Sequence, residues 1–383
     1  MVCKKIRLFT CVLVGIFSPV CGVYALDSTQ IEAVRSRTLQ SKSALSPADE
    51  AVVDKFVRDG LTELRFEEDA WRAVDAREAL LAQKGGAEMS PYAAAFASAV
   101  AEHLKVAFED AARLQQPRRQ RMTLSLMIIA ARLQTPELVP FGLAKLADSD
   151  PTIQYWAVKT VTNPGVAAQL TSQIVGDEDL TRSIINRLDQ VVGETMVPET
   201  MRMVVEFADR VGTAEGRVLV NKIADLRLRQ YANWTVKYEL LEMPILTSLG
   251  KQIVAETSDT RRADLLRRFA QLYSYVIERF VLSADVLDEK QKQQLVSVIA
   301  EVENGAVTEL FGRPQNRIRK ALEGNKPSVL EAERQILLGG PTQAGQLAGK
   351  FTYDYGKAGG SVITEPLRLK APVSANKQSS EQP

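Results

Sequence analysis

Histidine and cysteine, which many enzymes use for catalysis or metal binding, are scarce in this sequence. Histidine occurs once, as His103. The three cysteines are Cys3, Cys11 and Cys21. The chain beyond them therefore offers no Cys/His zinc site and no paired-cysteine redox centre, and any Ser-His-Asp triad would depend on His103. Because His103 precedes Ala107 by four residues, it falls on or beside the apolar stripe of a helix, where a packed histidine is favoured over a lone general base.

Carboxylates are plentiful, and the densest run is Glu67-Glu68-Asp69. Adjacent residues on a helix point in different directions, so this run favours a solvated helix face over a metal site or an acid–base pair. An exported glycosidase or polysaccharide lyase is the alternative, because it needs only two opposed carboxylates that can be distant in sequence. Few tryptophans could act as sugar platforms, and Trp156 fits a core stripe instead. We therefore assign no catalytic, cofactor-binding or metal-binding residue.

Basic and acidic residues are nearly balanced, with 48 Lys and Arg against 47 Asp and Glu. Such balance gives no chain-wide attraction to nucleic acid or to an anionic membrane. Two local basic clusters consist of Arg113, Arg118, Arg119 and Arg121, and of Arg261, Arg262, Arg267 and Arg268. Neither cluster alternates with aromatic residues as in single-strand binders. The second cluster lies on the polar face of its helix and is interpreted as a solvated surface. No nucleic-acid partner is expected.

The N-terminal segment has the pattern of a secretory signal peptide. Lys4, Lys5 and Arg7 precede an apolar run over residues 8–17, and a Val-Tyr-Ala sequence suits cleavage after Ala25. The alternative is an uncleaved anchor, because the apolar segment approaches the roughly 20 residues that span a bilayer. A proline and a glycine interrupt its second half, so cleavage is favoured. We predict export to the periplasm or the extracellular space, no membrane insertion after cleavage, and a mature chain without cysteine.

Helices are the elements expected to position any functional residue. A capping side chain directly precedes proline at Ser46-Pro47, Ser90-Pro91, Thr135-Pro136, Asp150-Pro151 and Asn163-Pro164. Such a side chain accepts a hydrogen bond from the first turn, where the missing N–H of proline costs nothing. After Asp150, the residues Ile153, Trp156, Ala157 and Val161 recur at helical spacing and predict one buried face. The sequence therefore predicts an all-α fold of antiparallel helical hairpins, an α-α superhelix.

Short segments recur along the chain. Residues 117–120 (PRRQ) align with 151–154 (PTIQ) at an offset of 34, and 148–152 (DSDPT) with 177–181 (DEDLT) at an offset of 29. These offsets are close to the length of one helical hairpin. They indicate a degenerate helical repeat.

The unit over residues 148–175 resembles HEAT-type repeats, which carry an Asp-Pro or similar start and small apolar residues on the first helix. It departs from them by its shorter spacing and by Gln154 and Lys159, where an arginine is typical. The resemblance is clearest over residues 117–192. It implies an array of helical hairpins.

The chain is expected to consist of a signal peptide (1–25), a lead-in segment (26–45), a helical repeat body (46–338, with longer helices over 198–338) and a Gly/Pro-rich tail (339–383). Residues 213–243 and 260–281 carry the longest helical patterns. The tail is predicted to be largely flexible and to be mobile from about Lys370, with residues 351–355 and 362–369 pairing at most as a weak hairpin.

The expected partner is another protein or a peptide. Units of a helical array are slightly rotated from one another, so their second helices line a surface suited to an extended segment. Here those helices are residues 137–147 and 165–175, and the candidate partner-binding residues on them are Lys145, Gln169, Thr171 and Gln173. These side chains are mostly polar and uncharged, which favours hydrogen bonding. We therefore predict an exported binding or scaffold protein without cofactor, with an exported carbohydrate-active enzyme as the alternative.

Overall fold

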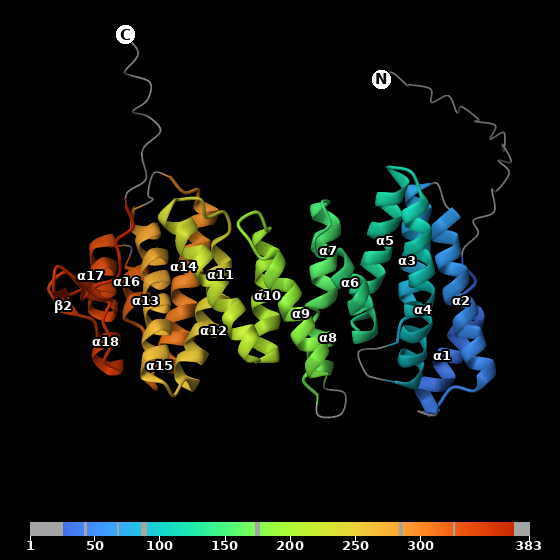
Figure 1. Ribbon diagram of the computed structural model, residues 1–383, viewed down its shortest axis with the longest axis horizontal. Coiled ribbons are helices and arrows are strands. Elements are labelled where there is room, and N and C mark those ends of the chain that lie inside the picture. Colours follow the sequence, from blue (N-terminus) through green and yellow to red (C-terminus); the bar gives the residue numbers. More distant parts are fainter. Residues whose placement is uncertain are drawn as a thin grey trace, which may run out of the picture. The chain divides into compact units, whose positions relative to one another are not determined.

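The described parts of the chain are almost entirely helical (Figure 1). The computed structural model describes residues 26–41, 44–66, 69–85, 90–172, 177–282, 286–324 and 326–370. The all-α prediction is confirmed, since strands in these parts form only two short hairpins near residues 339–362. Residues 1–25, which carry the predicted signal peptide, lie outside the described residues. The chain divides into two compact units, Met1–His103 and Leu104–Pro383.

The described part of the first unit is a group of packed helices. Its helices are α1 (Thr29–Ser41), α2 (Pro47–Phe66), α3 (Ala70–Ala82) and the first part of α4 (Pro91–Arg113), which continues into the second unit. Val57, Leu80 and Tyr92 are fully buried. The Tyr92 hydroxyl donates to the carbonyl oxygen of Gln83 at 2.8 Å, which ties the start of α4 to the end of α3.

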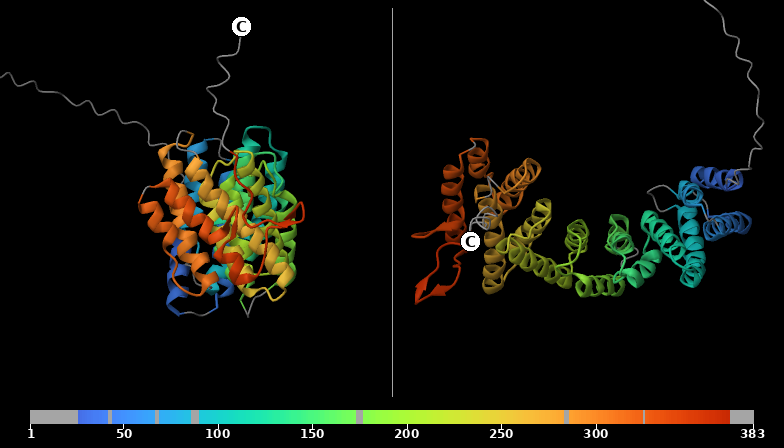
Figure 2. Two further views of the ribbon diagram at one scale, coloured as in Figure 1. Left: turned by 90° about the vertical axis from the view of Figure 1, so that its left-hand side faces the viewer. Right: turned by 90° about the horizontal axis from the view of Figure 1, so that it is seen from above.

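The helices of the second unit pack on near neighbours in the chain. They are α5 (Arg118–Leu133), η1 (Pro136–Leu138), α6 (Val139–Lys145), α7 (Pro151–Val161), α8 (Pro164–Leu170), α9 (Glu178–Val191), α10 (Pro198–Val211), α11 (Ala214–Ala232), η2 (Glu239–Leu241), α12 (Glu242–Ala255), α13 (Asp259–Leu282) and α14 (Glu289–Val302). Helix α7 packs on α5, α6 and α10, and α13 packs on α11, α12 and α14. Figure 2 shows the helices of this unit following one another in chain order. One apolar core runs through the unit and includes residues of α5, α7, α9, α11 and α13.

The hairpin of α7 and α8 is fixed by local bonds that its sequence supplies. Asn163 accepts a hydrogen bond from the N–H of Gly165 at 2.9 Å and so caps α8. Its amide also donates to the carbonyl oxygen of Ala131 at 3.0 Å, which joins this hairpin to the end of α5. A Cβ at Gly142 of α6 would lie 2.7 Å from Val161, so the close packing of α6 on α7 requires glycine there.

The predicted buried face of α7 is present. Ile153, Ala157 and Val161 are at most 4% exposed. Trp156 lies at the edge of this face, half-buried and packed against the core. The Lys159 ammonium group is 4.6 Å from the centre of the Trp156 ring, a distance suited to a cation–π contact.

The helix predicted over residues 213–243 is interrupted. Helix α11 ends at Ala232, and Trp234 has a left-handed backbone with φ of 57°. An irregular turn then leads to η2 and α12. Continuous helical periodicity hid this break, because a single residue with positive φ ends a helix without changing the apolar pattern. The pattern over residues 260–281 agrees closely with α13.

Beyond α14 the chain forms short elements and then two hairpins. These are η3 (Glu303–Val307), α15 (Thr308–Phe311), α16 (Arg317–Glu323), α17 (Pro327–Leu338), β1 (Gly339–Gly340), β2 (Gln343–Ala344), α18 (Gln346–Phe351), β3 (Lys357–Ala358) and β4 (Ser361–Val362). Strand β1 pairs with β2, and β3 pairs with β4, both antiparallel. Gly359 and Gly360 have φ of 55° and 87°, which suits the two-residue turn between β3 and β4.

Residues 339–370, the first part of the predicted tail, pack on the helices of the second unit. The Tyr355 hydroxyl donates to the carbonyl oxygen of Leu338 at 2.6 Å, and the rings of Tyr353 and Tyr355 lie 5.4 Å apart. Leu369 is 5% exposed and belongs to the core. A few apolar anchors and the hydrogen bonds around them order a segment whose glycine content predicted flexibility. Residues 371–383 lie outside the described residues.

Candidate functional site

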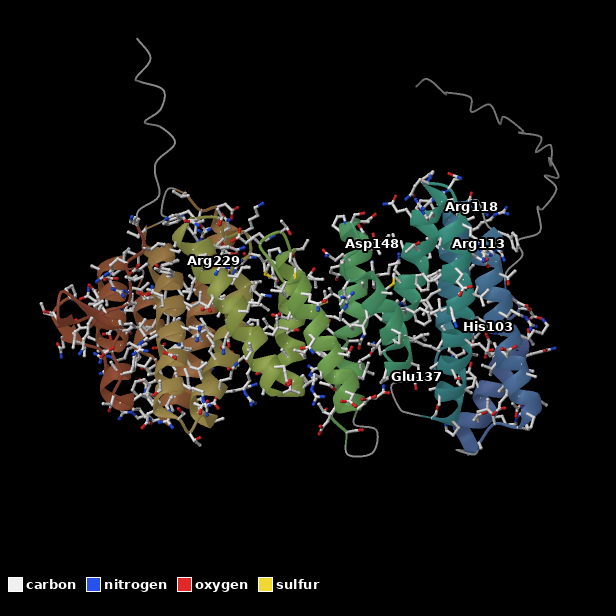
Figure 3. The ribbon with its side chains drawn as sticks, in the orientation of Figure 1. His103, Arg113, Arg118, Glu137, Asp148 and Arg229 are labelled. Carbon is white, nitrogen blue, oxygen red and sulfur yellow. The ribbon has the colours of Figure 1, made fainter. Side chains whose placement is uncertain are left out.

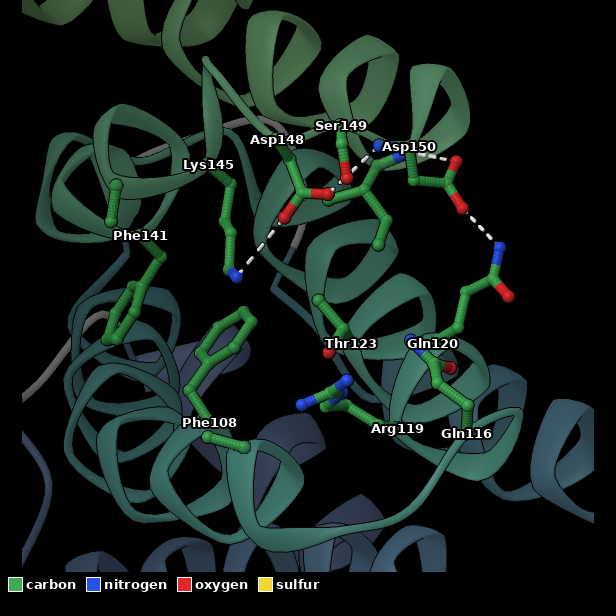
Figure 4. Close-up of a pocket in the computed structure, with 13 residues that line it drawn as sticks. Phe108, Gln116, Arg119, Gln120, Thr123, Phe141, Lys145, Asp148, Ser149 and Asp150 are labelled. Atoms are coloured by element: carbon green, nitrogen blue, oxygen red, sulfur yellow. Dashed lines mark hydrogen bonds and ion pairs between the residues drawn. The ribbon is translucent and has the colours of Figure 1, made fainter.

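A pocket of about 630 Å³ lies between the end of α4, α5, α6 and the start of α7 (Figure 4). We call it the Lys145 pocket. One wall is the stacked pair Phe108 and Phe141, whose ring centres are 5.4 Å apart with 18° between their planes. The remaining lining is largely polar and includes Lys145, Asp148 and Arg119. This volume and this mixture of surfaces are typical of sites that hold a small molecule or a few side chains.

The turn between α6 and α7 positions Lys145 and Asp148. The N–H of Asp148 donates to the carbonyl oxygen of Lys145 at 3.1 Å, and the Gln154 amide donates to the carbonyl oxygen of Leu146 at 2.9 Å. The Lys145 ammonium group is 3.3 Å from one Asp148 carboxylate oxygen. The other oxygen accepts from the N–H of Asp150 at 3.1 Å. Asp148 is therefore occupied by bonds that hold the turn.

Asp150, the second carboxylate of the pocket, is also used for structure. It caps α7 by accepting from the N–H groups of Thr152 at 2.7 Å and Ile153 at 3.3 Å, and it accepts from the Gln120 amide. Partial burial works against ionisation, but these donors outweigh it and hold the pKa of Asp150 below its usual value. The carboxyl group stays ionised near neutral pH, which makes it a poor proton donor.

Arg119 differs from these residues because its charge is not used within the described parts of the chain. Its side chain extends into the pocket from α5 (Figure 4). No ion pair or side-chain hydrogen bond to a described residue holds its guanidinium group. With Asp148 and Asp150 both engaged, Arg119 provides a positive charge that is available to a ligand.

Three of the candidate partner-binding residues, Lys145, Gln169 and Thr171, lie in the described parts of the chain. Lys145 lines the pocket. The Gln169 amide donates to the carbonyl oxygen of Gln134 at 3.1 Å, and the Thr171 hydroxyl donates to the carbonyl oxygen of Ala167 at 2.9 Å. Gln173 lies outside the described residues. The hydrogen bonds expected to hold a partner are thus made within the chain at Gln169 and Thr171, because both side chains lie within reach of carbonyl groups at helix ends.

His103 lies on α4 in the first unit (Figure 3). Its Nε2 atom is 2.6 Å from a carboxylate oxygen of Asp54 on α2, and its side chain is 19% exposed. The pair joins α2 to α4. This geometry agrees with the interpretation of His103 as a half-buried packing residue.

The second basic cluster lies on α13 and is compensated by acidic neighbours. The pairs are Arg261 with Glu256 at 3.1 Å, Arg262 with Asp259 at 3.1 Å, Arg267 with Asp264 at 2.8 Å, and Arg268 with Asp225 at 2.8 Å. In the first cluster, Arg113 is 3.5 Å from Asp110. Arg119 belongs to that same cluster, and its place in the pocket was not foreseen.

Two buried ion pairs between α11, α12 and α13 were also missed. Arg227 lies 2.6 Å from Glu242, and Arg279 lies 3.0 Å from Glu239, and all four side chains are at most 3% exposed. Arg227 follows Ile223 by four residues, so a cation on the apolar face of its helix was the available signal.

Burial raises the pKa of Glu242 to about 7, against the opposing effect of Arg227. A carboxyl group of that pKa suits general acid catalysis. Glu242 and Glu239 are both 0% exposed, however, and each is bound to an arginine. Both carboxyl groups lie away from solvent, where their arginine partners join the helices.

Among the described residues, no group of three or more His, Cys, Asp or Glu side chains is placed to hold a metal ion. None of the described helices is both long enough and apolar enough to cross a membrane.

No protein-family model matches this chain, and neither a curated protein nor a solved structure is detectably similar to it.

Proposed function

We propose that this chain is an exported, non-catalytic helical-repeat protein whose Lys145 pocket binds an acidic segment of another protein. The observation that carries the proposal is the guanidinium group of Arg119, which enters the pocket while both pocket carboxylates are engaged elsewhere. A carboxylate of the partner would pair with Arg119, which forms bidentate bonds to such groups. An apolar side chain beside it would pack on Phe108 and Phe141.

The state of the carboxylates favours binding over glycoside hydrolysis. A glycosidase needs one carboxyl group that carries a proton and a second one opposite it. Asp150 has a lowered pKa and caps α7, and Asp148 is paired with Lys145. Turnover of a polysaccharide that is abolished by replacing a single Asp or Glu would contradict the proposal.

Crosslinking in the native host tests the site. A photo-crosslinking residue at Ala144, which is exposed in the pocket, is expected to capture a partner protein. Ala168, an exposed alanine of α8 outside the pocket, is the matched control position. Arg119→Glu should reduce the Ala144 crosslink at least tenfold, because it replaces a charge-assisted bond by repulsion, a change of roughly 1.5–3 kcal/mol. Equal capture at both positions, or capture that survives Arg119→Glu, would rule out the pocket as the binding site.

Export is the second part of the proposal, and it rests on the basic start, the apolar run and the Val-Tyr-Ala sequence. The protein isolated from its native host is expected to begin at Leu26, which intact-mass measurement would show. A mass that includes residues 1–25 would indicate an N-terminal anchor.

A further inference from the structure

Residues 365–370, which we call the strap, are held against the rest of the second unit through their backbone. The Gln271 amide donates to the carbonyl oxygen of Leu367 at 2.8 Å, and its oxygen accepts from the N–H of Leu367 at 2.7 Å. Glu278 accepts from the N–H of Leu369 at 2.5 Å. The indole N–H of Trp234 donates to the carbonyl oxygen of Lys370 at 2.7 Å. Side chains thus grip main-chain groups that any extended peptide presents.

The same surface recognises two side chains of the strap. Leu369 is 5% exposed. Arg368 lies 3.3 Å from Glu278 and also pairs with Glu331 of α17. Leu367 is 67% exposed and contributes only its backbone. We call Trp234, Gln271, Glu278 and Glu331 the clamp. In the strap it holds an extended segment in which arginine is followed by leucine.

The strap is bound to the clamp by the kinds of contact that hold a short peptide to a protein. The Arg368 side chain is 40% exposed. Glu278 and Glu331 carry the acidic charge that a basic ligand needs. Because the strap is tethered to its site, a free segment must compete with an effective concentration on the order of millimolar.

We propose that the clamp is a binding site for an extended, arginine- and leucine-containing segment of a partner protein, and that the strap occupies this site until the partner displaces it. This site differs from the Lys145 pocket in location and in charge. Its ligand is basic, whereas the pocket takes an acidic one. The two proposals can therefore fail independently.

The test uses the full chain and a fluorescent synthetic peptide that copies residues 364–370 (TEPLRLK), with binding followed by anisotropy. The parent chain is expected to bind it weakly, because its own strap fills the clamp. Leu369→Asp, which weakens the strap, should tighten peptide binding at least tenfold. Adding Gln271→Ala to that variant, or using the peptide TEPLELK, should remove the gain. Arg119→Glu should leave peptide binding unchanged.

A second strap variant, Arg368→Ala, guards against misfolding of Leu369→Asp, and thermal melting by circular dichroism checks both. Equally weak binding by the parent and by both folded strap variants would overturn the proposal, as would binding that survives Gln271→Ala. Sedimentation gives the oligomeric state in the same samples. Strap exchange between two copies, seen as a dimer of the parent chain, would assign the clamp to a second copy of this chain and would also overturn the proposal.

Discussion

Arg227→Met is expected to lower the free energy of unfolding by about 3–5 kcal/mol at pH 8. The side chains of Arg227 and Glu242 are 1% and 0% exposed and lie 2.6 Å apart. Methionine would keep the apolar stem of the arginine but leave Glu242 without its cation, away from water. The cost of an unpaired buried charge exceeds the net value of the pair, and this is why removing one partner is so damaging.

The loss should depend on pH, and its sign follows from Glu242. Burial raises the folded-state pKa of Glu242 from 4.5 to about 7, despite Arg227. Its contribution to stability is therefore complete below about pH 4.5 and is lost as the pH rises through about 7. Without Arg227 the pKa should rise further. The loss should thus be smaller at pH 5 than at pH 8, by up to about 1.4 kcal/mol, because pH 8 lies about one unit above the parent pKa.

Guanidinium unfolding followed by circular dichroism at both pH values measures this effect. Lys251→Met is the matched control, because Lys251 pairs with Asp209 while 52% exposed, and its loss should stay within about 1 kcal/mol. The double variant Arg227→Met/Glu242→Leu should recover most of the stability, since an apolar pair needs no counter-charge. An equal loss at pH 5 and pH 8 would show that Glu242 is not the cause.

Arg334→Met is the second change with a large expected effect, about 3 kcal/mol. Arg334 is completely buried on α17. It donates to the Ser274 hydroxyl at 2.9 Å, binds both oxygens of Glu331 at 2.8 and 2.9 Å, and lies 3.5 Å from Glu278. Its removal leaves Glu278 with Arg368 as its remaining ionic partner among the described residues, and it frees Glu331 to move. The strap should therefore loosen together with the global loss of stability.

Limited trypsin digestion with intact-mass detection separates the two effects. Cleavage at Arg368 should become several-fold faster in Arg334→Met under conditions where circular dichroism shows the variant to be folded. Arg268→Met is the control, because Arg268 pairs with Asp225 at the surface of α13, and little change is expected. Unchanged cleavage at Arg368 in a destabilised variant would show that Arg334 supports the core without positioning the strap.

The HEAT-type resemblance remains an interpretation of the sequence. Residues 339–370 of the tail are held in place by contacts with residues elsewhere in the chain. Glycine and proline content predicted flexibility from residue 339 onward. The composition of a segment indicates the entropy that ordering it costs. It does not show which distant residues contact the segment and offset that cost. Gln271, which binds Leu367 from a position 96 residues earlier in the chain, is such a residue.

The sequence by itself determined the helices and where many of them begin. Asp150 and Asn163 cap α7 and α8 as predicted, and the pattern over residues 260–281 became α13. These signals act over about four residues, within the reach of one helical turn, so they are readable without knowing the fold. The break at Trp234 could not be predicted, because it results from the positive φ angle of a single residue and leaves the apolar pattern unchanged.

The tertiary structure alone decided which polar groups meet. In the sequence, Arg119 is one arginine of a basic cluster. Its position in the pocket depends on the packing of α6 and α7 beside α5. Arg227 finds Glu242 across a turn, and Arg368 reaches Glu278 on α13, 90 residues away. Such pairings depend on the direction of every intervening turn and on the packing of the whole unit. The apolar periodicity of a helix does not determine the direction of the turns or the packing of the unit. It could therefore predict the faces of the helices but not the pocket or the clamp.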